Sequence, residues 1–286
     1  MKIDIILITY NQEQYIAKAV ESILMQETDK HVNIIVADDN SSDSTLKIIQ
    51  GYNNASSRFQ FDFLPSNKCN VGISKNYGRA FAKCAGKYIF ILEGDDYWCN
   101  PHHIEQHIEF LETHHEASMS LNCFILLNEE KSLFVYPSNK SLEFYNIKQQ
   151  IVDINHLGNL SACCFRTSLI YQLPAKIFNL DFADWLLGMF MAQYGLLAVL
   201  SEPTTVYRIN KNGQWSGLTE AKKREKLIDA CYQYNEFFDG KYTEYFNELQ
   251  QKLTKKENKV RKRDWLPPIL KYLFKLFIPE NVRKYK

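Results

Sequence analysis

The feature that most constrains this chain is an alternation of short apolar runs with amphipathic stretches over its first hundred residues. The apolar runs have the length and the flanking turn residues of buried strands, and between them apolar side chains recur at helical spacing. The runs predict strands at residues 3–8, 32–37, 59–63 and 89–92, and the intervening stretches predict helices at residues 16–24, 46–49 and 73–84.

Strands that alternate with helices form a mostly parallel sheet with helices on both faces. We therefore expect an α/β fold, with one Rossmann-like domain built on a mostly parallel central sheet. In such sheets, ligands bind beyond the carboxyl ends of the strands. This rule gathers four turns at one edge of the sheet: residues 9–11, 38–39, 70–76 and 93–96.

The turn after the fourth predicted strand carries three carboxylates, Glu93, Asp95 and Asp96, around one glycine. Carboxylates crowded at the end of a buried strand repel one another, so they need a cation or a role that uses the repulsion. Mg²⁺ and Mn²⁺ prefer oxygen ligands and often bridge a carboxylate to phosphates. The run indicates a metal site, with a solvated acidic turn as the alternative, and Gly94 would let a ligand approach closely.

The glycine-rich phosphate loops of other nucleotide-binding proteins are absent. No G-x-G-x-x-G follows the first predicted strand, and no G-x-x-x-x-G-K-[ST] occurs anywhere in the sequence. Phosphates would therefore need a metal, which the acidic turn could hold. Asp39 could accept a hydrogen bond from a base N–H, or it could form a turn, while Asp43 or Ser44 is a plausible helix cap.

Length and composition limit the classes of function. The 286 residues fit one large domain, with or without appendages, and the net charge of +1 gives no global field that would select nucleic acid. The seven cysteines include no Cys-x-x-Cys pair, and no signal peptide is evident, so we expect reduced thiols in a cytoplasmic protein. The sequence has no run of about 20 apolar residues, so it predicts no membrane-spanning helix.

The order and spacing of these motifs resemble those of the family 2 glycosyltransferases, which have the A-type nucleotide-sugar fold. The resemblance covers about residues 1 to 215. It implies that Thr9 and Asp39 contact the nucleoside, Asp39 at its base, and that Asp95 and Asp96 carry the metal, Mn²⁺ or Mg²⁺, and the diphosphate. The residues expected to bind the nucleotide sugar, with a UDP-type donor favoured, are Thr9, Tyr10, Asn11, Asp38, Asp39, Gly72, Asn76, Glu93 and Asp95.

Many members of this family have Asp where this chain has Glu93, and the longer side chain could place this carboxylate on the sugar or ribose. Further along, Asp184 precedes a tryptophan in the first turn of an apolar helix. An acid in that position is usually a favourable cap. The resemblance instead implies that Asp184 is the catalytic base, with Asp181 as the fallback, and that Arg208 could face the diphosphate.

We divide the chain into a transferase domain, a helical extension at residues 216–253 and a basic amphipathic tail at residues 254–286. Within the domain, residues 1–100 form the nucleotide-sugar half and residues 101–215 the acceptor half, in which 137–150 read as an irregular acceptor loop. Basic charge beside an aromatic-rich amphipathic helix suits an anionic membrane surface, with docking on a partner subunit as the alternative.

His103 and His107 share a helical face at the i, i+4 spacing, but no further zinc ligands are evident, so we expect solvated surface histidines. The resulting hypothesis is an inverting glycosyltransferase at the inner face of the cell membrane. By resemblance, it acts in cell-surface polysaccharide or lipopolysaccharide synthesis on an acceptor that could be lipid-linked. The rival functions are a nucleotidyltransferase and a non-catalytic nucleotide- or sugar-binding scaffold at the membrane.

Overall fold

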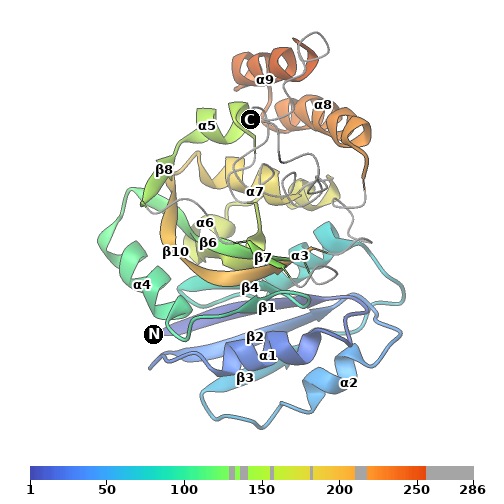
Figure 1. Ribbon diagram of the computed structural model, residues 1–286, viewed down its shortest axis with the longest axis vertical. Coiled ribbons are helices and arrows are strands. Elements are labelled where there is room, and N and C mark those ends of the chain that lie inside the picture. Colours follow the sequence, from blue (N-terminus) through green and yellow to red (C-terminus); the bar gives the residue numbers. More distant parts are fainter. Residues whose placement is uncertain (129–132, 136–140, 155–157, 181–182, 210–217, 256–286) are drawn as a thin grey trace.

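The computed structural model describes residues 1–128, 133–135, 141–154, 158–180, 183–209 and 218–255 (Figure 1). Ten strands form one sheet, whose main path runs β3-β2-β1-β4-β9-β6-β10-β5. Pairs β2–β3, β1–β2, β1–β4 and β6–β10 are parallel, whereas β9 is antiparallel to both of its neighbours. The expected α/β fold with a mostly parallel central sheet is confirmed. The helices expected towards the C-terminus of the chain are also confirmed.

The nucleotide-sugar half has the predicted alternation of strands and helices. Its elements are β1 (Lys2–Thr9), α1 (Ile16–Leu24), β2 (His31–Asp38), α2 (Thr45–Gln50), β3 (Phe59–Phe63), α3 (Ile73–Phe81) and β4 (Tyr88–Glu93). Both central strands, β1 and β4, are buried along nearly their whole length, as expected for strands covered by helices on two faces. Of the two largest apolar clusters, one joins the sheet to α1, α2 and α4, and the other joins it to α3, α7 and the C-terminal helices.

The rest of the chain completes the sheet and adds a helical layer. The elements are β5 (Tyr97–Trp98), α4 (His103–Thr113), β6 (Ala117–Asn128), β7 (Leu133–Val135), β8 (Glu143–Tyr145), α5 (Ile147–Val152), η2 (Leu160–Ala162), β9 (Cys163–Arg166), α6 (Thr167–Ile170), η3 (Ala175–Asn179), α7 (Ala183–Met191), β10 (Leu196–Arg208), α8 (Glu220–Phe237) and α9 (Thr243–Lys255). Figure 1 shows α8 and α9 stacked beyond α5 and α7, at the opposite end of the molecule from α1 and α2.

Two predictions for the acceptor half are wrong. The described part of residues 137–150 is not an irregular loop, because it contains β8 and most of α5, whose N-terminus is closed by a capping box between Asn146 and Gln149. The sequence also predicts two strands, at residues 199–203 and 206–209, but the structure has one continuous strand there, β10. Its pairing with β6 shifts register between Leu200 and Thr205, and the irregularity there interrupts the apolar pattern.

The prediction of surface histidines is also wrong. His103 and His107 are fully buried, and their rings lie 4.7 Å apart between α4 and the sheet. The Nδ1 atom of His103 lies 2.7 Å from Thr204 Oγ1, and that of His107 lies 2.7 Å from Ser120 Oγ. Burial lowers the pKa of His107 to about 3, so it is neutral at physiological pH.

Across the described residues we find no helix with the length and apolar character needed to span a bilayer. The basic tail lies almost entirely outside the described residues, from residue 256 onwards.

Candidate active site

The loops after β1 and β2 clasp each other at the carboxyl edge of the sheet. The backbone N–H of Asn11 donates to Ser41 Oγ at 2.9 Å, and the backbone N–H of Ser42 donates to Asn11 Oδ1 at 2.8 Å. The N–H of Gln12 donates to Thr45 Oγ1, at the start of α2, at 2.7 Å. Asn11 adopts a left-handed backbone conformation, with φ of 51°, which Asn tolerates better than most residues. Asn11 therefore joins two loops at the predicted site.

The other predicted nucleoside residues near this clasp differ in exposure. Thr9 is buried, and its hydroxyl donates to Gln12 Oε1 at 2.7 Å. Tyr10 is 46% exposed, so its ring is available at the surface. The Asp38 carboxylate accepts hydrogen bonds from both the backbone N–H and the hydroxyl of Ser41, the geometry of an Asx-type turn. Of the three, Tyr10 alone presents a largely exposed side chain.

Asp39 is buried and fastens the loop that precedes α3. Its backbone N–H donates to the carbonyl of Thr9 at 2.9 Å. Its carboxylate accepts three hydrogen bonds at 2.9–3.0 Å, from Asn67 Nδ2 and from the backbone N–H groups of Val71 and Gly72. The structure thus places Asp39 where predicted, at the edge between the first two strands, and gives its oxygens partners within the protein.

The predicted residues of the third turn shape the start of α3. Gly72 has φ of +88°, a conformation that favours glycine, and it precedes the first residue of the helix. Asn76 is buried, and its Nδ2 donates to the carbonyl of Ala37 at 2.7 Å while its Oδ1 accepts from Arg79. The side-chain amide of Asn76 therefore ties α3 to the end of β2.

Glu93, the last residue of β4, is held from two sides. Its Oε1 accepts a hydrogen bond from the Tyr77 hydroxyl of α3 at 2.7 Å, and its backbone N–H donates to Ser161 Oγ at 3.0 Å. Burial, followed by the charges of Asp95 and Asp184, raises the pKa of Glu93 to about 7. Carboxyl groups with a pKa raised to this extent occur often at functional sites.

Asp96 is 1% exposed and links three segments of the chain. Its Oδ2 accepts from Asn159 Nδ2 at 2.8 Å and from Ser161 Oγ at 2.7 Å, and its Oδ1 accepts from the backbone N–H of Arg208 at 3.0 Å. Burial and the neighbouring charges of Asp95 and Glu93 raise its pKa well above the usual value. Sequence reasoning missed Asn159 altogether.

Gly94 makes room for the protein itself. A Cβ atom at this position would lie 2.4 Å from Gln12 Oε1 and 2.8 Å from Ile16 Cδ1, so the space assigned to a ligand is filled by the loop after β1 and by α1. Ser161 and Ala162 are also fully buried, and the Ser161 hydroxyl is already bonded to Glu93 and Asp96.

Asp184 reaches the same edge from a distant part of the sequence. It lies in the first turn of α7, and its charge contributes to the raised pKa of both Glu93 and Tyr77. The pKa of the half-buried Tyr207 hydroxyl is raised by burial and then, in decreasing order, by the charges of Asp96, Glu93, Asp95 and Asp184. The charges of all four acids thus act on one residue of β10, whereas the alternative base, Asp181, falls outside the described residues.

Arg208 lies beside this acid cluster. Its guanidinium carbon is 5.0 Å from the centre of the Tyr15 ring and 5.2 Å from that of Tyr97, distances typical of cation–π contacts. Tyr15 immediately precedes α1, and Tyr97 follows the acidic turn. Arg208 is thus held at the edge of the site, and the segment that follows it, residues 210–217, lies outside the described part of the chain.

The acids have the chemistry of a divalent-cation site. Within the described ranges, no group of three or more His, Cys, Asp or Glu side chains is arranged as a complete metal site. The carboxylate oxygens of Glu93, Asp95 and Asp96 are nevertheless the ligand type that Mg²⁺ and Mn²⁺ prefer, and these ions often take further ligands from substrate phosphates. Three protein donors already bind the Asp96 carboxylate, so an ion that contacts Asp96 would share its oxygens with Asn159, Ser161 and Arg208.

Comparison with known proteins gives a consistent family match. The sequence model described as Glycosyl transferase family 2 matches residues 4–170. An uncharacterised protein of Mycobacterium tuberculosis is 28% identical over 228 residues, which cover 77% of this chain and 62% of that relative. The chain therefore spans less than two thirds of the relative's length.

Two further proteins resemble the chain in sequence or structure. Poly(ribitol-phosphate) beta-N-acetylglucosaminyltransferase TarS of Staphylococcus aureus is 30% identical over 116 residues, 40% of this chain and 20% of TarS. A crystal structure of TarS with UDP-GlcNAc has a TM-score of 0.65 at 19% identity, covering 99% of this chain and 78% of the other. Mannosyltransferase PcManGT of Pyrobaculum calidifontis, solved with GDP-Man and Mn²⁺, has a TM-score of 0.63 at 13% identity, covering 98% and 81%.

Proposed function

This chain belongs to glycosyl transferase family 2, and on that premise we propose that it is an inverting, metal-dependent glycosyltransferase. It moves a sugar from a nucleoside diphosphate sugar to an acceptor hydroxyl. The observation that carries the proposal is the acidic turn at the end of β4, where hydrogen bonds fix Glu93 to Tyr77 and the buried Asp96 to Asn159, Ser161 and Arg208.

The donor lies along the carboxyl edge of β1, β2 and β4. Its nucleoside occupies the clasped loops after β1 and β2, next to Tyr10 and Asp39, and its diphosphate lies over the acidic turn. A UDP-type donor is favoured, since a structural neighbour was solved with UDP-GlcNAc, although another was solved with GDP-Man. Asp39 then exchanges or shares its loop contacts when a base N–H arrives.

Asp95 holds Mn²⁺ or Mg²⁺, with Asp96 fixing the turn in place or adding a ligand. When bound, the ion offsets charge that builds on the leaving diphosphate. Glu93, held by Tyr77, faces the sugar or ribose. A neighbour solved with GDP-Man and Mn²⁺ supports this assignment of a divalent ion.

Asp184 is the general base. It takes a proton from the acceptor hydroxyl as the oxygen attacks the anomeric carbon from the face opposite the leaving diphosphate. This displacement inverts the anomeric centre in one step, so neither a Ser nor a Cys nucleophile is required. The position of Asp184 supports the role, because it lies in the first turn of α7 and its charge acts on Glu93 in the acidic turn.

The acceptor belongs to cell-surface polysaccharide or lipopolysaccharide synthesis. The resemblance to TarS, named for a poly(ribitol-phosphate) acceptor, supports a surface polymer. We place the enzyme in the cytoplasm at the inner face of the membrane, with a sugar or lipid-linked acceptor and a peripheral contact through the tail at residues 254–286. The basic and aromatic composition of that tail supports the membrane contact.

The experiment that tests this function is thermal stability against a panel of nucleoside diphosphates with Mn²⁺, Mg²⁺ or EDTA. A ligand that binds the folded state raises the unfolding midpoint by mass action. We expect the largest metal-dependent rise with UDP. A rise with one other nucleotide would reassign the base of the donor, whereas no rise with any nucleotide would favour a non-catalytic scaffold.

A further inference from the structure

The helix α8 contacts α7, the helix that carries the proposed base, and α9 packs on α5, which also contacts α7. We infer that this extension positions Asp184 through its neighbour Trp185, with Tyr234 of α8 as the positioning residue. The inference rests on the proposed function, because it takes Asp184 as the base. It gives the extension a role in the reaction, beyond covering an apolar face.

Trp185 is held by two different helices. It is 2% exposed, and its indole Nε1 donates to the carbonyl of Gln150 in α5 at 2.8 Å. Its ring meets that of Tyr234, which is fully buried, at a centroid distance of 5.3 Å and an angle of 66°. An edge-to-face aromatic pair and a buried hydrogen bond fix both the position and the rotation of the indole.

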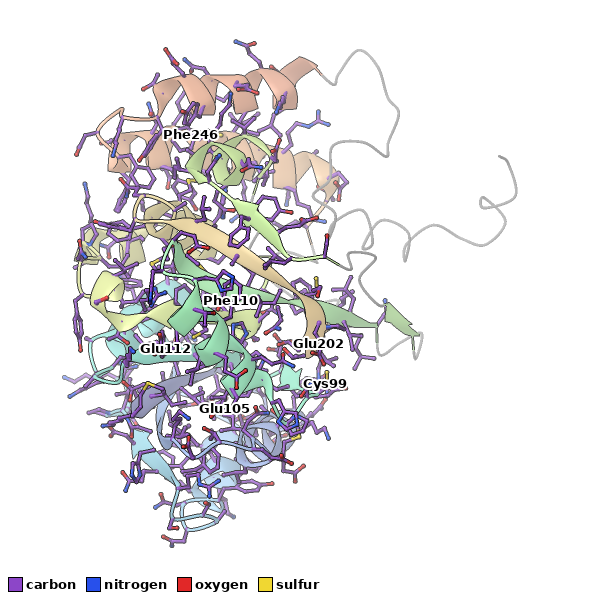
Figure 2. All side chains as sticks on the ribbon, turned by 90° about the vertical axis from the view of Figure 1, so that its left-hand side faces the viewer. Cys99, Glu105, Phe110, Glu112, Glu202 and Phe246 are labelled. Carbon is purple, nitrogen blue, oxygen red and sulfur yellow. The ribbon has the colours of Figure 1, made fainter. Side chains whose placement is uncertain are left out.

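The second helix of the extension supports the same tryptophan indirectly, through α5. Lys148 and Asp153, at the two ends of α5, pair with Glu248 and Lys252 of α9 at 3.6 and 3.5 Å. Phe246 of α9, labelled in Figure 2, is 2% exposed within the apolar cluster that also contains Trp185. Both helices of the extension therefore converge on Trp185, one directly and one through α5.

The position of Trp185 determines that of Asp184. The two residues are adjacent in a helix, so their side chains project about 100° apart, one into the apolar cluster and the other towards the acids. Residues 185–192 are all buried, so the residues packed around this part of α7 restrict its movement. Losing the ring of Tyr234 would let Trp185 move, and a 1 Å displacement of a catalytic group can cost about a hundredfold in rate.

This support lies beyond the part of the chain that the family shares most clearly. The family match ends at residue 170, before α7, α8 and α9 begin. The base would therefore be positioned by a part of the molecule outside the matched segment, while the acids of β4 lie within it.

Tyr234→Leu tests the role of the aromatic ring, and the chain offers a matched control. Tyr232 is on the same helix but is 64% exposed, so Tyr232→Leu makes the same chemical change away from Trp185. Trp185→Phe keeps a smaller ring beside Tyr234 and removes the donor to Gln150, which provides a second variant should Tyr234→Leu fail to fold.

Two readouts separate positioning from general stability. The first readout is turnover, measured as UDP release from UDP-GlcNAc in Mn²⁺, with water in place of the acceptor. The second is the rate of amide hydrogen exchange across residues 183–191, which reports whether α7 is held in position. We expect Tyr234→Leu to lower kcat about ten- to hundredfold, with the KM for UDP-GlcNAc within about twofold, and to speed exchange in α7. Trp185→Phe should shift both readouts in the same direction by less, and Tyr232→Leu should match the wild type.

Wild-type exchange and wild-type turnover in both Tyr234→Leu and Trp185→Phe would overturn the inference. Loss of UDP binding along with turnover would also overturn it, because the extension would then support the whole fold. Asp184→Asn, assayed alongside, separates the two ideas: if it keeps near-normal turnover, the proposed base is wrong. If it is inactive while Tyr234→Leu is fully active with wild-type exchange, the positioning role alone fails.

Discussion

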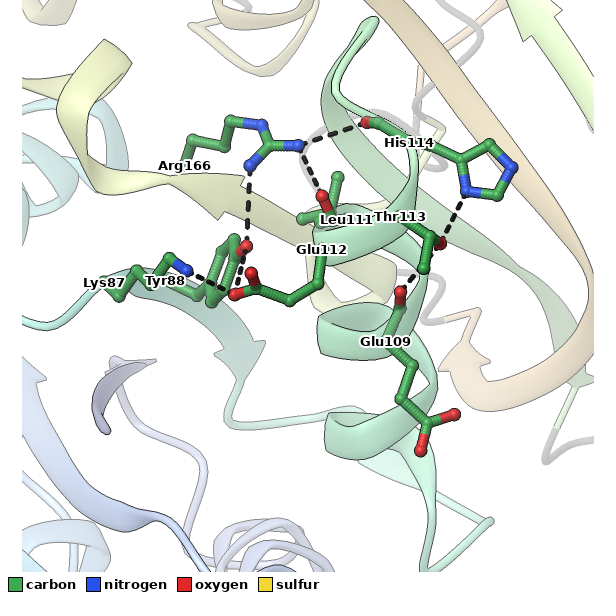
Figure 3. A network of polar contacts seen from close by, with 8 residues as sticks. All are labelled: Lys87, Tyr88, Glu109, Leu111, Glu112, Thr113, His114 and Arg166. Atoms are coloured by element: carbon green, nitrogen blue, oxygen red, sulfur yellow. Dashed lines mark hydrogen bonds and ion pairs between the residues drawn. The ribbon is translucent and has the colours of Figure 1, made fainter.

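Charged side chains have opposite surroundings at the two ends of β4. At the amino end, the Arg166 guanidinium donates to the carbonyls of Leu111 and His114 and to the Tyr88 hydroxyl (Figure 3). It also donates to the carbonyl of Ala117. Glu112 accepts from Lys87 and from Tyr88, and these hydrogen bonds lower its pKa. At the carboxyl end, Glu93 and Asp96 are buried with like charges nearby, and their pKa values are raised.

The difference separates an end of the strand that stabilises the fold from an end that carries chemistry. Arg166 satisfies carbonyls at the C-terminus of α4 that have no partner within the helix, a structural role for a cation. Crowded acids instead destabilise the fold unless a ligand or metal offsets their charge, and proteins retain such sites where function requires them. The predictions below test this contrast.

The largest expected effect concerns the base. Asp184→Asn should lower the rate of UDP release from a UDP-sugar by about 10²- to 10⁴-fold, because the amide cannot take up the proton. UDP affinity in Mn²⁺ should change little. Asp229→Asn, the same change at an exposed position on α8, is the control and should be fully active. Near-normal turnover in Asp184→Asn would remove this residue from the chemistry.

Glu93→Gln should stabilise the fold at the carboxyl end. The pKa of Glu93 is about 7 in the folded protein, above the unfolded value, so ionisation destabilises the native state as pH rises through this range. Removing the charge should raise the free energy of unfolding by up to about 3 kcal/mol at pH 8 in EDTA, and the gain should disappear below about pH 4.5. Urea unfolding of the wild type and Glu93→Gln at pH 8 and at about pH 4.5 measures this gain in stability. A loss of stability in Glu93→Gln at pH 8 would contradict the proposed difference between the two ends of β4.

Arg166→Met should have the opposite consequence at the amino end. It leaves the carbonyls of Leu111, His114 and Ala117 without this donor, so the free energy of unfolding should fall by about 2 kcal/mol. The midpoint of UDP binding should be unchanged, because the site lies at the other end of the strand. Arg58→Met, at an exposed position, is the control and should cost little.

The smallest effect concerns the exposed pair at the amino end. Glu112→Gln should lower stability, by less than about 1 kcal/mol, because the Lys87 and Glu112 side chains are 53% and 41% exposed. The sign of this change in the free energy of unfolding matters most, because the same substitution at Glu93 is expected to stabilise the fold. If both glutamates respond alike in urea unfolding at pH 8, the two ends of β4 do not differ as we describe.

Sequence patterns predicted the half of the site that is local in the chain. The alternating runs placed β1, β2 and β4, and the parallel-sheet rule then placed Asp39 and the acidic turn at one edge. The hydrogen-bond partners of Asp96, at positions 159, 161 and 208, come from segments 63 or more residues away, where nothing in the local pattern indicates them. Long-range contacts of this kind are visible only in three dimensions.

The errors have physical causes of the same type. His103 and His107 fall one residue before Ile104 and Ile108, on the same buried stripe of α4, so the spacing that suggested a surface pair also suits a core pair. Their partners, Thr204 and a serine on β6, let the sheet accept polar rings. The strand β8 and the helix α5 have only three and six residues, so apolar residues such as Ile147 and Ile151 are too few turns apart to establish a period.

The most direct test of the central claim is calorimetric titration of UDP into the wild type and Asp95→Asn, each in Mn²⁺ and in EDTA. If the acids at the end of β4 form a metal–nucleotide site, the wild type should bind UDP only in Mn²⁺. Asp95→Asn should lose about tenfold or more in affinity, and Asp229→Asn should behave as the wild type. Equal UDP affinity with and without Mn²⁺, in both the wild type and Asp95→Asn, would contradict the account.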